Sequence, residues 1–145
     1  MARSRKDPRH RAREAALQIL YQWEIGGRDV GQAAETFFGL QWPNADPPPA
    51  DLRTFATALS HDTVARLDAI DPLIAETVER WRPERLAVLD RLILRMAICE
   101  LLRDPATPPA VVINEALELA RTFSTEEAVK FINGMLDAIR KKIRT

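Results

Sequence analysis

The sequence has a single cysteine, Cys99, among its 145 residues, and only two histidines and five glycines. One cysteine cannot form an internal disulfide or a cysteine-rich zinc site, which indicates a reducing compartment and a core held by packing alone. No segment approaches the roughly 18 uncharged apolar residues of a membrane-spanning helix, and the charged start MARSRKDPRHRARE has no apolar run behind it. We therefore expect a soluble, cytoplasmic protein without a membrane-bound part.

An excess of charge of either sign is also missing, because 21 lysine and arginine residues balance 21 acidic residues. The chain as a whole thus has no field that would attract a polyanion. The first thirteen residues are an exception, since they hold six cations against the single acid Asp7. Such a local excess is typical of phosphate contact and also of a solubilising tail. We expect a flexible basic arm over residues 1–13, with the cations Arg3, Arg5, Lys6, Arg9, Arg11 and Arg13 as RNA-binding candidates.

Apolar residues at helical spacing, separated by prolines, make up most of the chain. This spacing predicts helices over residues 9–25 and 30–37, with Asp29 as the cap of the second, and then one long loop around three consecutive prolines. A segment over 51–81 changes the phase of its apolar stripe, which predicts a bend near residues 60–62. We found no run of alternating β-branched residues, so the fold class is all-α with about six or seven helices.

The second half of the chain continues this pattern. Pro83 suits the first turn of a helix that ends before Pro105 and is apolar on several sides, which predicts a central position. Further helices are expected after Pro109 and from Ser124 to the C-terminus. Ser124 and Glu127 have the spacing of a capping box, in which each side chain bonds the other residue's amide.

Residues that could support catalysis are few. The two histidines lie far apart without a metal-binding motif, and Cys99 has apolar neighbours, which favours an inert buried thiol. Neither a glycine-rich phosphate loop nor a nucleophile elbow is present. We expect a protein that is not an enzyme and has no catalytic residue, metal or cofactor.

Two further side chains have more than one interpretation. Arg95 lies within the most apolar segment, where a guanidinium needs an acidic partner, and we predict a structural ion pair of Arg95 with Glu115. Tyr21 lies beside the cations of the first helix and could stack on a base. An aromatic core residue with its hydroxyl at the surface is an equally good interpretation of Tyr21.

Four segments together resemble the NusB family in order and spacing. They are REAALQILYQW at 13–23, LDRLILRMAICEL at 89–101, VVINEALELA at 111–120 and KFINGMLD at 130–137. The resemblance implies one NusB-like domain over 1–145, built of two packed helical bundles at about 9–81 and 82–145. It further implies a factor that binds boxA RNA of ribosomal RNA leader transcripts together with NusE, a small-subunit ribosomal protein. The pair would act in the RNA polymerase antitermination complex and promote read-through of terminators.

The same resemblance assigns residues to the RNA surface. The arm would meet phosphates of single-stranded RNA, and Asp90 matches a position near the same surface. One departure is Thr77, where many members have an aromatic residue or a histidine, so one stacking contact is expected to be missing. The remaining residues that would lie on or near the RNA are Tyr21, Glu127, Lys130, Phe131 and Asn133.

Two alternatives stay open from the sequence. The chain could be a self-associating or protein-binding helical module, for example a homodimer, in which the arm only aids solubility. It could also be an accessory RNA-binding module for a separate ribosomal-RNA-modifying enzyme, since NusB-like modules also occur fused to such methyltransferases.

Overall fold

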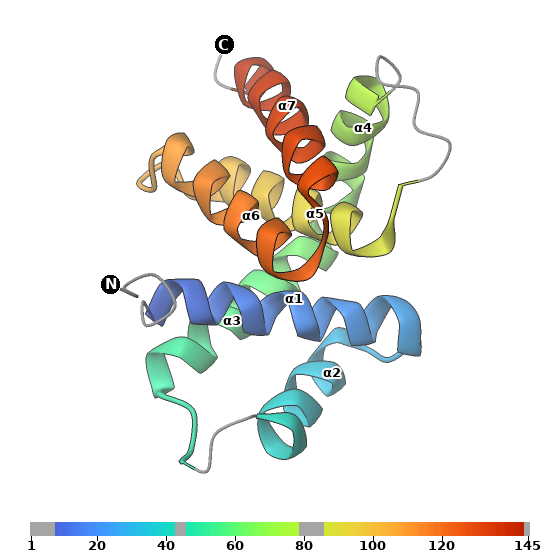
Figure 1. The fold of residues 1–145 in the computed structure, drawn as a ribbon. Helices are drawn as coiled ribbons and strands as arrows, with labels where there is room; N and C mark the ends of the chain where they lie inside the picture. Colours follow the sequence, from blue (N-terminus) through green and yellow to red (C-terminus); the bar gives the residue numbers. More distant parts are fainter. Residues whose placement is uncertain (1–7, 43–45, 79–85, 144–145) are drawn as a thin grey trace. The chain divides into compact units, whose positions relative to one another are not determined.

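Helices account for all of the regular structure in the described residues. The computed structural model describes residues 8–42, 46–78 and 86–143, in which seven α-helices and one π-helical turn follow one another without a strand (Figure 1). They form two compact units, the first reaching Val64 and the second starting at Ala65. No helix in these ranges is long and apolar enough to cross a membrane. The all-α prediction is confirmed.

The first unit consists of α1 (Pro8–Gly26), α2 (Val30–Thr36), the π-helical turn η2 (Phe37–Gln41) and α3 (Ala50–Ala65). Gly27 has a φ of 69°, a left-handed conformation that ends α1 at little steric cost. The carboxylate of Asp29 then accepts hydrogen bonds from the amides of Gly31 and Gln32, at 3.0 and 3.3 Å, and caps α2 as predicted.

Small side chains line the buried side of α1 and α2. Because they are short, the two helices approach closely, and the larger rings of Phe37 and Phe38 fill the space beside them. The buried alanines of these helices are Ala12, Ala15, Ala16, Ala33 and Ala34. The alanines of α1 are therefore part of its core face.

The helix that was predicted to bend near residues 60–62 breaks a few residues later, at Arg66. Helix α3 continues to Ala65, and α4 (Leu67–Val78) begins after Arg66, whose carbonyl accepts from the amides of Ala69 and Ile70. Within α3 the hydroxyls of Ser60 and Thr63 donate to carbonyls four residues earlier, at 3.0 and 2.7 Å. These polar side chains are thereby satisfied inside the helix and do not interrupt it.

The second unit contains α4, α5 (Val88–Arg103), α6 (Pro109–Phe123) and α7 (Glu126–Ile143). We expected α4 to pack with the N-terminal helices and the boundary between the two bundles to lie near residue 81. In the structure α4 packs against α5 and α7, so by its contacts it belongs to the second unit. Pro83, expected in the first turn of α5, lies outside the described residues, and α5 begins at Val88.

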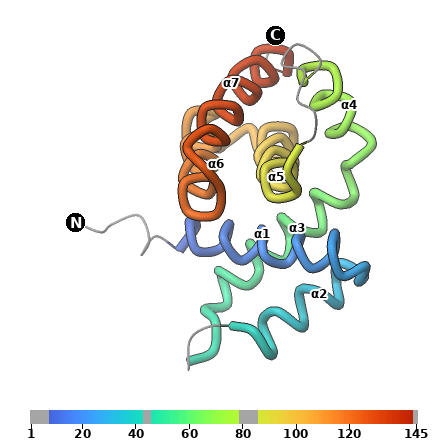
Figure 2. Tube along the Cα trace, turned by 45° about the vertical axis from the view of Figure 1, so that its right-hand side comes forward, coloured from blue at the N-terminus to red at the C-terminus, as the bar shows by residue number. Residues whose placement is uncertain are grey.

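Helix α5 is the centre of the second unit. It contacts α4, α6 and α7, and Figure 2 shows it with these helices arranged around it. Ten of its side chains are buried, which explains why its sequence is apolar on several sides. The predicted central position is confirmed.

The start of α7 differs from the predicted capping box. Thr125, not Ser124, is the cap: its Oγ1 accepts from the amide of Ala128 at 3.0 Å. The Ser124 hydroxyl instead donates to Oδ1 of Asp90 on α5 at 2.7 Å. Because Thr125 is the cap, the Ser124 hydroxyl can bond Asp90 on α5, and Glu127 does not take part in a capping box.

Replacing the cap tests this assignment. Thr125→Ala removes the acceptor for a helix amide and should lower the free energy of unfolding by about 1 kcal/mol, whereas Thr125→Ser keeps the oxygen and should be nearly neutral. Chemical denaturation followed by circular dichroism measures both. Equal stability of the alanine variant and the unchanged protein would contradict Thr125 as the cap.

Candidate nucleic-acid interface

The described part of the basic arm is helical. Helix α1 begins at Pro8. Proline is favoured at the first position of a helix because the N–H that it lacks would have no hydrogen-bond partner within the helix. Residues 8–13 of the expected flexible arm are thus part of α1. The candidates Arg3, Arg5 and Lys6 lie outside the described residues.

The three described arginines of the arm each lie over an aromatic ring. The Cζ atoms of Arg9 and Arg13 are 4.2 and 5.4 Å from the centroid of Phe55 on α3. Arg11 lies 5.3 Å from the centroid of Trp42. An arginine held over an aromatic ring keeps its positive charge, so these contacts position the cations without neutralising them.

Exposure separates the three arginines. Arg9 is exposed and Arg11 is half-buried, so both have N–H groups that a ligand could reach. Arg13 is only 5% exposed. The structure therefore places Arg13 within the protein, where it supports the surface electrostatically and through Phe55.

Tyr21 lies on the open side of α1. Its side chain is 41% exposed, so it is not a core aromatic of the described chain. Of the two interpretations left open by the sequence, the exposed ring favours base stacking.

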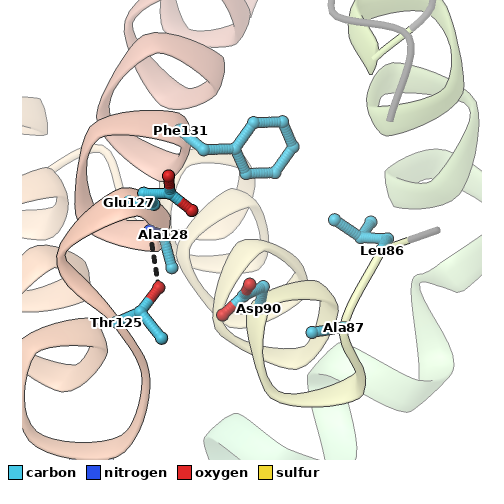
Figure 3. A pocket seen from close by; sticks show the side chains of 7 residues that line it. All are labelled: Leu86, Ala87, Asp90, Thr125, Glu127, Ala128 and Phe131. Carbon is cyan, nitrogen blue, oxygen red and sulfur yellow. Dashed lines mark hydrogen bonds between the residues drawn. The ribbon is translucent and has the colours of Figure 1, made fainter. Parts of the chain in front are cut away.

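The second group of predicted residues gathers in the second unit, around the start of α7. Glu127, Lys130 and Asn133 are exposed and Phe131 is half-buried. Glu127 and Phe131 are four residues apart and so lie on one side of the helix. Figure 3 shows both beside a cavity that also receives Asp90 from α5.

This cavity has a volume of about 230 Å³ and is acidic. Asp90 and Glu127 bring two carboxylates to it, and no lysine or arginine is among the described residues that line it. Asp90 is 9% exposed and is oriented by the hydrogen bond from Ser124. The full lining comprises Leu86, Ala87, Asp90, Thr125, Glu127, Ala128 and Phe131.

Such a cavity selects for particular chemistry. Carboxylates repel phosphate but accept hydrogen bonds from the amino groups of adenine and cytosine, and an aromatic edge offers stacking. The cavity is thus suited to a base and not to the backbone. Sequence reasoning missed the bond from Ser124 that orients Asp90, because the two residues are 34 positions apart and no local pattern links them.

Arg95 has a structural role of the predicted kind, with a partner that the sequence did not indicate. Its Nε and one terminal nitrogen donate to the two carboxylate oxygens of Asp71 on α4, each at 3.0 Å. The pair of Arg95 with Glu115 stays a prediction. Asp71 was missed because it comes from a different helix, 24 residues earlier.

Thr77, the departure from the family pattern, is a buried residue of α4. Its hydroxyl donates to the carbonyl of Leu73 at 2.8 Å and lies 3.2 Å from the Nζ of Lys142. The side chain is 2% exposed, so it offers no surface for stacking. Cys99 is also fully buried, and the described residues contain no group of three or more potential metal ligands.

Comparison with known proteins decides the family. A model of the NusB family matches residues 10–141. The chain belongs to the NusB family. The transcription antitermination protein NusB of Koribacter versatilis (strain Ellin345) is 42% identical to it over 135 residues, which cover 93% of this chain and 90% of that protein.

Solved NusB structures have the same fold. T. maritima NusB superimposes with a TM-score of 0.80 at 34% identity, covering 92% of this chain and 91% of the other. A crystal structure of the antitermination factors NusB and NusE in complex with dsRNA contains a chain that matches with a TM-score of 0.76 at 28% identity. That match covers 98% of this chain and 99% of the other.

The ion pair of Arg95 gives a test of the second unit. Asp71→Ala removes the bidentate partner of a side chain that is only 11% exposed and should lower the free energy of unfolding by about 1–3 kcal/mol. Asp68→Ala, an exposed acid on the same helix, serves as the control and should have a small effect. Equal thermal midpoints for the two variants would contradict a structural role for the pair.

Proposed function

We propose that this chain is a transcription antitermination factor that binds boxA RNA of ribosomal RNA leader transcripts together with NusE. The pair promotes read-through of terminators by RNA polymerase. The observation that carries this proposal is membership of the NusB family over residues 10–141, nearly the whole chain. The complex of NusB and NusE with RNA known for a matching chain supports the choice of partners.

Phosphate contact is assigned to the basic arm and the first turn of α1. A backbone phosphate needs N–H donors that reach the surface, which the half-buried Arg11 and the exposed Arg9 supply. Arg13 adds positive potential from its buried position over Phe55. Arg3, Arg5 and Lys6 complete the cationic arm over residues 1–13 of a single NusB-like domain.

Base contact is assigned to the acidic cavity and to exposed aromatic rings. Asp90 and Glu127 accept from exocyclic amino groups, and because they repel phosphate they favour strand orientations that turn bases toward the cavity. Phe131 and Tyr21 stack on bases. Lys130, three residues after Glu127, adds a cation beside it, and Asn133 adds an exposed amide farther around α7.

The proposed function contains no chemical step on a substrate. RNA and NusE are bound and released unchanged, so the chain acts as a binding protein without a catalytic residue or cofactor. We place this activity in the cytoplasm, where transcripts are made and where the buried thiol of Cys99 stays reduced.

The arm gives the first test of RNA binding. If roughly five phosphates are neutralised, the logarithm of the binding constant for single-stranded boxA RNA should fall against the logarithm of salt concentration with a slope of about −3.5. The combined change of Arg5, Lys6 and Arg9 to alanine should weaken binding and flatten this slope, without unfolding the protein. Filter-binding titrations with NusE at several salt concentrations measure both.

A charge-matched control separates contact from net charge. Arg28, Arg66 and Arg121 are exposed arginines outside the arm, and their combined change to alanine removes the same total charge. This control should leave the slope nearly unchanged. A flat slope for the unchanged protein, or equal losses in the two triple variants, would remove the arm from the mechanism.

The cavity gives the second test. Phe131→Leu keeps an apolar side chain but removes the stacking face, so RNA affinity should fall about 5-fold or more while the salt slope stays the same. Phe123→Leu, a half-buried phenylalanine on α6, is the matched control. Unchanged affinity of the Phe131 variant would remove the cavity from the base-binding surface.

A further inference from the structure

The first unit holds a second group of arginines and rings, of which the proposed function uses only Arg11. The Cζ of Arg11 is 5.3 Å from the centroid of Trp42, and the Cζ of Arg53 is 5.3 Å from the centroid of Phe38. The centroids of Phe38 and Trp42 are 5.7 Å apart. Helices α1 and α3 thus each place one guanidinium on the same pair of rings.

The rings form a rigid support. Phe37 and Phe38 are buried and meet edge to face at 5.0 Å, and Phe37 also contacts Trp42 at 6.2 Å. The indole N–H of Trp42 donates to the carbonyl of Asp46 at 3.1 Å. Trp42 is therefore held by two rings and a hydrogen bond, yet it remains half-buried and keeps part of its surface open.

Arg53 has the properties of a phosphate contact. It is exposed, and its guanidinium lies over the ring of Phe38, which restricts its rotamers while leaving N–H groups that can donate to a phosphate. Less conformational entropy is then lost when a phosphate binds. Cations interleaved with aromatic rings are the arrangement that single-stranded nucleic acids require.

The group is continuous with the RNA side proposed for α1. Arg11 and Tyr21 are ten residues apart, about 80° around the helix, with half-buried Arg11 at the edge of the buried side and Tyr21 on the open side. The side chains of Gln22 and Gln41 are hydrogen bonded, which holds the end of η2, next to Trp42, against α1. A strand that contacts Arg11 would therefore have Trp42 and Arg53 beside it.

We infer that Arg53 and Trp42 extend the RNA surface of the first unit, with Arg53 binding a backbone phosphate and Trp42 stacking on an unpaired base. This inference rests on the proposed RNA-binding function. The ligand is the single strand already proposed, and the new element is a second row of contacts on α3 and after η2.

A comparison of two single-charge variants tests the phosphate contact. Arg53→Gln should weaken binding of boxA RNA that has single-stranded flanks and reduce the magnitude of the salt slope by about 0.7, the value for one phosphate. Arg28→Gln is the matched control, because Arg28 is an exposed arginine of the same unit that bonds Thr36. The Arg28 variant should leave both the RNA affinity and the salt slope unchanged.

Trp42 is tested with a pair of variants. Trp42→Leu should lower RNA affinity about 5-fold or more without changing the salt slope, and Trp42→Phe should retain most of the affinity. Circular dichroism checks folding, and if the leucine variant unfolds, the Arg53 variant still decides whether the inference holds.

The outcomes separate the inference from the proposed function. If the unchanged protein does not bind the RNA in the presence of NusE, the proposed function fails. If it binds, and Arg53→Gln and Arg28→Gln give equal affinities and slopes, the inference is overturned. It is overturned as well if Arg53→Gln weakens binding to NusE measured without RNA and leaves the RNA salt slope unchanged.

Discussion

Close packing of apolar side chains is the constraint on which this structure depends. A single buried cysteine leaves no internal disulfide, so the core has to exclude water by shape alone. Each unit solves this differently: α1 and α2 approach through alanines, whereas α5 is enclosed by three other helices. Because the interior is filled in this way, functional side chains have fixed surfaces from which to project.

On these surfaces, cations and acids have separate tasks. In the first unit, the guanidinium groups of Arg9 and Arg11 lie over aromatic rings, which position these cations without neutralising them. In the second unit, two carboxylates and a phenylalanine line a cavity that suits the amino edge of a base. Under the proposed function, a chain with no net charge acquires RNA affinity from local clustering of cations, while the acids favour bases over the backbone.

Sequence patterns predicted what depends on neighbours along the chain. The helical spacing, the Asp29 cap and the central position of α5 follow from local periodicity, and the family resemblance named Phe131 and Glu127 as candidates for the RNA surface. Contacts between distant segments were not predictable in this way. Asp71 reaches Arg95 from another helix, and Ser124 bonds Asp90 across the second unit, because tertiary packing and not spacing selects those partners. The stacking of Arg9 and Arg13 on Phe55 belongs to the same class.

The most direct test of the account is the equilibrium affinity of the purified full chain, with NusE, for a single-stranded boxA oligonucleotide and for a scrambled sequence of equal length and charge. Local cations alone would bind both equally, whereas cations combined with a base-reading cavity should favour boxA. We predict tighter binding of boxA, with salt slopes that are the same for the two oligonucleotides. Equal affinity for boxA and the scrambled strand, or no binding of either, would contradict the account.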